Sequence, residues 1–92
     1  MSINQQPSKY MQTNTTGTIS SGRGVLQRII VSSTSSGTIK IYDNTAASGT
    51  VILETFTPTA GQTLDFDNLL FTNGLHIVVA NTIEFTVVYT DI

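Results

Sequence analysis

The chain contains no cysteine and no tryptophan, and it has a single histidine among its 92 residues. The absence of cysteine excludes disulfide bonds and a thiol nucleophile, and His76 alone cannot supply the ligand set of a zinc site. No cofactor is therefore expected. A domain of this size buries only about 64% of its unfolded surface, so it gains little stability from its own core. Small domains are commonly stabilised by disulfide bonds, by a metal ion or by oligomerisation. Since the first two are excluded here, we expect oligomerisation.

Charge is also scarce, since only 11% of the residues are charged and the net charge is −2. The basic residues Lys9, Arg23, Arg28 and Lys40 are too few for a surface that binds nucleic-acid phosphates. The many β-branched apolar residues and the low net charge are atypical of a disordered chain. Roughly a quarter of the residues are Ser or Thr. We expect a folded protein without a nucleic-acid or membrane partner.

The first 16 residues are polar and show neither helical nor strand periodicity. They lack the apolar core of a signal peptide, so we expect the protein to be made and used in the cytoplasm, or to leave it by another route such as cell lysis. Residues 1–16 are interpreted as an extended N-terminal arm, with a disordered tail as the alternative. The residues of this arm that we expect to contact a partner surface are Ile3, Gln5, Gln6, Lys9, Tyr10 and Met11.

Residues 17–92 contain short β segments separated by turn residues. The clearest example lies between Gly37 and Leu53, where the triplet Ser-Gly-Thr twice precedes a β-branched run. The two runs, at residues 39–41 and 51–53, are parted by a polar turn, which predicts a β-hairpin.

Two other segments alternate between apolar and polar residues, as a half-buried strand does. Leu64 and Phe66 share one face of the segment 63–67, and its polar residues share the other. The alternation is clearest in the segment 82–90. No stretch of the chain favours a helix longer than one turn, because glycine and β-branched residues interrupt the possible helical windows.

Turn residues indicate where these strands end. The Ser/Thr/Gly cluster at residues 32–37 is expected to end the strand that begins at Val25, and Asn81 to separate the strands 75–80 and 82–90. Seven or eight strands at spacings of about 8 to 12 residues predict an all-β fold. We expect an antiparallel β-sandwich, jelly-roll-like, that forms a single domain over residues 17–92 behind the N-terminal arm.

Several strands carry apolar residues on both faces, although a small sandwich buries only one face of each sheet. We expect the surplus to be covered by a neighbouring subunit, and a register error of one residue is the alternative for part of it. The predicted subunit interface consists of Leu26, Ile30, Tyr42, Ile52, Phe56, Val78 and Val88.

Residue types that perform catalysis are nearly absent. His76 lies between Leu75 and Ile77 and has no neighbouring nucleophile, so a satisfied or solvated histidine is favoured over a catalytic one. Asp65 and Asp67 could bridge a calcium ion if loops supplied carbonyl oxygens, but two solvated acids that keep a sheet edge soluble are favoured. We expect neither enzymatic activity nor a small-molecule substrate.

Three motifs together resemble small structural proteins of tailed bacteriophages. They are GTIKIYDNTAASGTVI at residues 37–52, FTNGL at residues 71–75 and FTVVY at residues 85–89. The resemblance covers about residues 25–89 and involves turn and core residues without catalytic content. It implies a virion component, specifically a capsid cement or decoration protein that binds the major capsid protein on the outer head surface as a homotrimer.

The main alternative is a tail-associated module that binds a receptor or carbohydrate. Such modules present exposed aromatic residues as flat platforms, whereas this chain has no tryptophan and only three tyrosines. A tail or connector subunit of the same class of virion is a third interpretation, with rings of a different symmetry.

Overall fold

The computed structural model describes residues 7–92, and this part of the chain is all-β and antiparallel, as the sequence predicts. The strands are β1 (Lys9–Thr13), β2 (Gly17–Ser20), β3 (Gly24–Asp43), β4 (Thr50–Phe56), β5 (Thr63–Phe71) and β6 (Leu75–Asp91). Residues 7–92 contain no helix that could cross a membrane.

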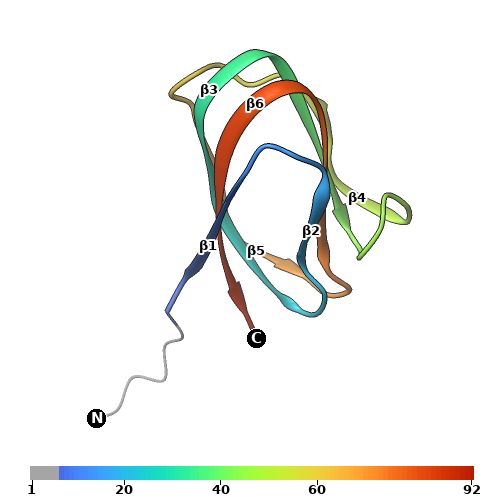
Figure 1. Ribbon diagram of the computed structural model, residues 1–92. Helices are drawn as coiled ribbons and strands as arrows, with labels where there is room; N and C mark the ends of the chain where they lie inside the picture. The colour runs from blue at the N-terminus through green and yellow to red at the C-terminus, as the bar shows by residue number, and fades with distance from the viewer. Residues whose placement is uncertain (1–6) are drawn as a thin grey trace.

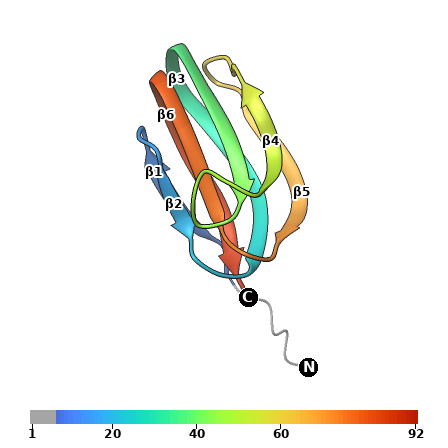
Figure 2. The ribbon, with the colours of Figure 1, turned by 90° about the vertical axis from the view of Figure 1, so that its right-hand side faces the viewer.

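The long strands β3 and β6 pair with each other along almost their whole length, and both arch over at the top of Figure 1. The single sheet therefore folds over on itself. One half contains β1, β6, β3 and β5, and we call it the first half-sheet. The second half-sheet contains β2, β6, β3 and β4. Figure 2 shows this arrangement from the side. It is compatible with the predicted sandwich, while a jelly-roll topology stays a prediction.

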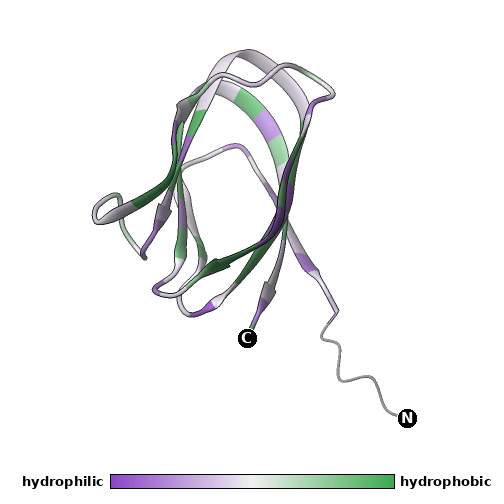
Figure 3. Cartoon of the chain, turned by 180° about the vertical axis from the view of Figure 1, so that it is seen from behind, coloured by the Kyte–Doolittle hydropathy of each residue, from purple (hydrophilic) through white to green (hydrophobic). Residues whose placement is uncertain are grey.

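The bend of the sheet lies where turn residues were expected to end strands. Backbone pairing between β3 and β6 instead continues through it, with register shifts near Ser33 and Ser36. Ser36 and Asn81 take positive φ values of 57° and 62°, and the Asn81 amide donates a hydrogen bond of 2.9 Å to the Ser36 carbonyl. Figure 3 shows pale, weakly hydrophilic residues at this bend and hydrophobic residues along the strands. The expected short strands are thus the halves of two long ones.

Gly37 allows the two strands to approach closely within the bend. A Cβ atom at this buried position would lie 2.5 Å from the Ile83 Cβ and 2.6 Å from the Thr82 carbonyl oxygen. These distances are shorter than van der Waals contact, so any other residue would force the strands apart.

The hydrophobic core lies between the half-sheets and consists of Ile19, Leu26, Ile29, Val31, Ile39, Ile41, Phe71, Leu75, Ile77, Ile83, Phe85, Val87 and Tyr89. The assignment of Leu26 to the outer face was wrong, because Leu26 is fully buried. The register of β3 shifts between Leu26 and Arg28, where Gln27 is an extra residue. Such a bulge changes the alternation of side chains, so that Leu26 and Ile29 both face the core.

The other predicted interface residues do not form one patch. Ile52 and Phe56 pack against the core and are only partly buried. Ile30 and Val88 lie on the outer face of the first half-sheet, whereas Tyr42 and Val78 lie on the outer face of the second. Since the two outer faces point in opposite directions, a single neighbour cannot cover all of these residues.

The predicted N-terminal arm is partly a strand of the sheet. Residues 9–13 form β1, which pairs with residues 85–89 of β6 in unbroken register. The sheet therefore begins before the predicted boundary at residue 16, because backbone hydrogen bonds order this segment without any apolar periodicity. Ile3, Gln5 and Gln6 lie outside the described residues.

Candidate binding site

The folded sheet has two lateral seams, where edge strands of the two half-sheets lie beside each other. At the β1/β2 seam, both edge strands flank β6. At the β4/β5 seam, both edge strands flank β3. The two seams lie on opposite sides of the molecule, because β6 and β3 stand between them.

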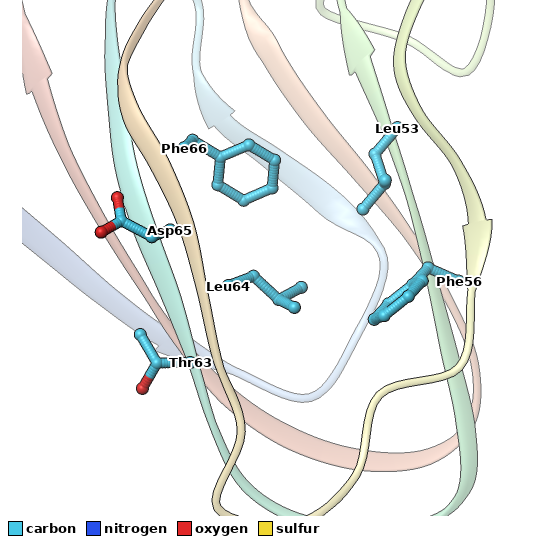
Figure 4. Close-up of a pocket in the computed structure, with 6 residues that line it drawn as sticks. All are labelled: Leu53, Phe56, Thr63, Leu64, Asp65 and Phe66. Carbon is cyan, nitrogen blue, oxygen red and sulfur yellow. The ribbon is translucent and has the colours of Figure 1, made fainter.

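The β4/β5 seam is open and apolar. A slot of about 290 Å³ lies here, lined by Leu53 and Phe56 of β4 and by Leu64 and Phe66 of β5. Figure 4 shows these side chains pointing toward one another across the seam, while Asp65 points to the other side of β5. The four apolar side chains are partly buried and pack against the core, so the slot is a continuation of the core to the surface.

Bulges in β4 bring its two slot residues to the same face. Leu53 is paired with Ile41, and Phe56 with Ile39, so the register shifts between these pairs. Regular alternation would place residues three apart on opposite faces of a strand. The extra residue in β4 removes this difference, and both side chains face the slot.

Strand β5 is also irregular at its edge. The Asp65 carboxylate accepts a hydrogen bond of 2.9 Å from the Asp67 N–H, and Asp67 and Asn68 take positive φ values of 53° and 60°. The expected alternation of residues 63–67 is confirmed, since Leu64 and Phe66 pack against the core and the polar residues are exposed. Within residues 7–92 no group of three potential metal-ligating side chains is present, so the aspartates have no further protein ligand of this kind.

The β1/β2 seam is closed by polar contacts. The Asp91 carboxylate accepts hydrogen bonds from the Ser20 hydroxyl at 2.6 Å and from the Lys9 ammonium at 2.9 Å. These contacts join β1, β2 and β6. The hydrogen bond from Ser20 and the contact with Lys9 hold the pKa of the Asp91 carboxyl below its ordinary value, although partial burial acts in the opposite direction. A polar hollow of about 310 Å³ beside Asp91 is lined by Arg23 and Ile92 among others.

A second carboxylate, that of Asp43, orders the connection from β5 to β6. Its Oδ1 atom accepts hydrogen bonds from the N–H groups of Thr72, Asn73 and Gly74 at 3.0, 2.8 and 3.3 Å. Partial burial raises the pKa of Asp43. The hydrogen bonds from these N–H donors together lower the pKa by more than burial raises it, so the pKa lies below its ordinary value. Asp43 therefore has a structural role in the crossing between the half-sheets.

His76 lies on the outer face of the second half-sheet and contacts a hydroxyl group. Its Nδ1 is 2.9 Å from the Thr18 hydroxyl, which donates its proton to the Thr45 carbonyl at 2.9 Å. The hydroxyl has one proton, so it accepts the hydrogen bond from the His76 N–H. His76 thus ties β2 to β6.

Tyr42 lies on the same outer face and is covered by a lysine. The Lys40 ammonium is 5.2 Å from the centre of the Tyr42 ring and 3.3 Å from the Glu54 carboxylate. Tyr42 is only partly exposed, so this face lacks the flat aromatic platform typical of a carbohydrate site.

The predicted contact residues of the N-terminal segment are exposed where the structure describes them. Tyr10 is 75% exposed and Met11 is 37% exposed, and both lie in β1. The slot residues Leu53, Leu64 and Phe66 were not predicted as a binding site. Their apolar character was visible in the sequence, but the sequence does not indicate that β4 and β5 form the two edges of one seam.

No protein-family model, curated protein or solved structure matches this chain.

Proposed function

We propose that this protein is a non-enzymatic structural protein of a tailed-bacteriophage particle. It acts as a capsid cement or decoration protein, which binds the major capsid protein on the outer head surface as a homotrimer and stabilises the shell. Its place in the mature particle is the capsid surface, after synthesis in the cytoplasm of the bacterial host.

The observation that carries this proposal is the open apolar slot at the β4/β5 seam. A small domain without disulfides that leaves part of its core open gains stability when a neighbouring subunit covers the opening, which supports the homotrimer. The described residues support a structural role as well, because the Asp43 and Asp91 carboxylates accept hydrogen bonds that connect different parts of the fold. The resemblance of the motifs at residues 37–52, 71–75 and 85–89 to phage structural proteins supports the phage particle as the setting.

The test begins with phage heads produced without this gene. The purified protein is added to these heads, and bound protein is measured by sedimentation and located by immunogold labelling. We expect saturable binding to the head surface and release of DNA at a higher temperature than from uncoated heads. Labelling of the tail would favour the tail-associated module, and absence of binding to particles would contradict the proposal.

The role of the N-terminal segment is tested with a chain that lacks residues 1–6. This deletion leaves β1 intact, whereas removal of residues 1–14 would also remove an edge strand. We expect weaker binding to heads without loss of the fold, because Ile3, Gln5 and Gln6 belong to the proposed contact. Unchanged binding would show that this segment does not contact the capsid.

A further inference from the structure

We infer that the slot at the β4/β5 seam receives the Tyr10 side chain of a second copy of this chain, so that copies pack head to tail in a closed ring. This deepens the homo-oligomer of the proposed function and does not depend on the phage particle.

Tyr10 is a suitable side chain to fill the slot. Among the large hydrophobic side chains that the structure describes, it is the most exposed. Tyrosine has a rigid apolar ring with a polar hydroxyl at its tip, so it can fill an apolar opening while its hydroxyl stays in water. The slot of about 290 Å³ is at the lower limit of small-molecule sites and has room for one aromatic ring.

Tyr10 cannot enter the slot of its own chain. It is opposite Val88 in β6, which is opposite Arg28 in β3, which is opposite Asp65 in β5. Three strand spacings separate Tyr10 from the slot strand, which is about 14 Å. The ring and the slot therefore lie on opposite edges of the first half-sheet, and their contact requires two molecules.

The two edges differ in the charges that remain outside ion pairs. At the β1/β2 edge Lys9 is paired with Asp91, and the Arg23 guanidinium remains. At the β4/β5 edge Glu54 is paired with Lys40, and the Asp65 and Asp67 carboxylates remain. Complementary charges favour the encounter of the β1/β2 edge of one copy with the β4/β5 edge of the next, and they disfavour the contact of like edges.

The irregular backbone of β4 and β5 indicates recognition by a side chain and not by strand addition. Both strands contain register shifts, and β5 carries acidic residues beside its bulge. Bulges and charges on edge strands hinder pairing with another strand. A side chain inserted between the two edges does not require regular backbone pairing.

The position of the two partners defines the symmetry of the assembly. A contact between different surfaces of identical subunits is heterologous, and repeated contacts of this kind form a ring when the rotation closes. The proposed homotrimer is such a ring with three copies.

The absence of cysteine makes cross-linking a direct test. We would mix the single variants Tyr10→Cys and Leu64→Cys at a protein concentration well above the dissociation constant of the wild type, because both substitutions weaken the proposed contact, and treat them with a short bis-maleimide linker. Covalent dimers are expected from the mixture, and the matched control Tyr42→Cys, on the outer face of the second half-sheet, should give none with Leu64→Cys. The double variant Tyr10→Cys/Leu64→Cys should give a ladder that ends at the trimer.

Association without cross-links is measured by sedimentation equilibrium of the full chain. Tyr10→Ser should raise the dissociation constant about tenfold or more, since loss of a central aromatic anchor costs at least this much in protein interfaces. Tyr10→Phe keeps the ring and should keep the association. Circular dichroism checks that both variants are folded.

Three results would overturn the inference. They are a wild-type chain that stays monomeric at all concentrations, a Tyr10→Ser variant that associates like the wild type, and a ladder that also forms with Tyr42→Cys. Head binding is measured separately. If the protein forms rings that depend on Tyr10 but does not bind heads, only the proposed function is contradicted. If the protein binds heads but Tyr10→Ser associates like the wild type, only the inference is contradicted.

Discussion

The two seams of the folded sheet face the same physical problem and differ in how it is solved. Each is a place where the edges of two half-sheets lie beside each other over the core. At the β1/β2 seam, Asp91 joins both edge strands through Ser20 and Lys9. At the β4/β5 seam, no hydrogen bond joins the two strands in the part of the chain that the structure describes, and apolar side chains line the opening.

This difference indicates that the seams have different roles. A seam closed by polar contacts within one chain needs no partner, because its donors and acceptors are satisfied. An opening lined by apolar side chains stays exposed to water until a partner covers it. The slot therefore leaves apolar side chains in contact with water that the closed seam does not.

The largest expected effect comes from truncating a leucine of the core, and truncating a leucine of the open seam is the comparison. Leu26→Ala should lower the free energy of unfolding by about 3 kcal/mol, because Leu26 is fully buried. Leu64→Ala should lower it by about 1 kcal/mol, since Leu64 is only partly buried at the slot. Urea denaturation at low protein concentration measures both changes. Equal losses would show that the slot is as closed as the core.

A somewhat smaller effect is expected where the sheet bends to create both seams. Gly37→Ala should destabilise the protein by about 2 kcal/mol, because the added Cβ would overlap with the Ile83 Cβ and the Thr82 carbonyl oxygen. Gly22→Ala is the matched control, since a Cβ there meets no atom within 4 Å. Thermal denaturation of both variants tests the bend. A wild-type melting temperature for Gly37→Ala would contradict the close approach of β3 and β6.

At the closed seam, Asp91→Asn should cost about 1 kcal/mol, because the amide binds Ser20 and Lys9 more weakly than the carboxylate does. Asp91 is partly exposed, so screening by water keeps the loss small. Asp67→Asn, at the open seam, is the matched control and should have no effect. It removes an exposed carboxylate at a positive φ, which asparagine tolerates. A comparable loss in both variants would contradict the difference between the seams.

The smallest effect is a dependence of stability on pH. The pKa values of Asp43 and Asp91 are lowered in the folded state, so the unfolded chain binds more protons as the pH falls. Their contribution is present above the ordinary aspartate pKa of about 3.9 and is lost as the pH falls through the lowered folded-state values. Melting temperatures between about pH 2 and pH 7 should fall on acidification. The fall should be shallower in Asp91→Asn, and a rise on acidification would contradict the prediction.

Much of the fold follows from local patterns that the sequence displays. Alternation placed Leu64 and Phe66 on one face of a strand, and the β-branched runs after Gly37 and Gly49 marked β-strands correctly. The scarcity of helix-forming windows predicted the all-β class. These features depend on neighbouring residues only, so a single sequence contains them.

The prediction failed where distant backbone pairing overrides local pattern. Polar residues at 32–37 and Asn81 are typical of strand ends, but pairing between β3 and β6 carries both strands through the bend. Residues 9–13 have no apolar periodicity, yet hydrogen bonds to β6 make them a strand. In each case the stabilising contact is with residues far away in the sequence.

By itself, the sequence determined that the protein is built of antiparallel strands and has no cysteine chemistry, because composition and alternation act locally. The tertiary structure alone decided that Leu26 is buried, that the half-sheets meet in two unlike seams, and that Tyr10 and the slot lie on opposite edges. The physical reason is that one extra residue in a paired strand reverses the face of every residue after it. Pairing with distant strands sets the position of that residue.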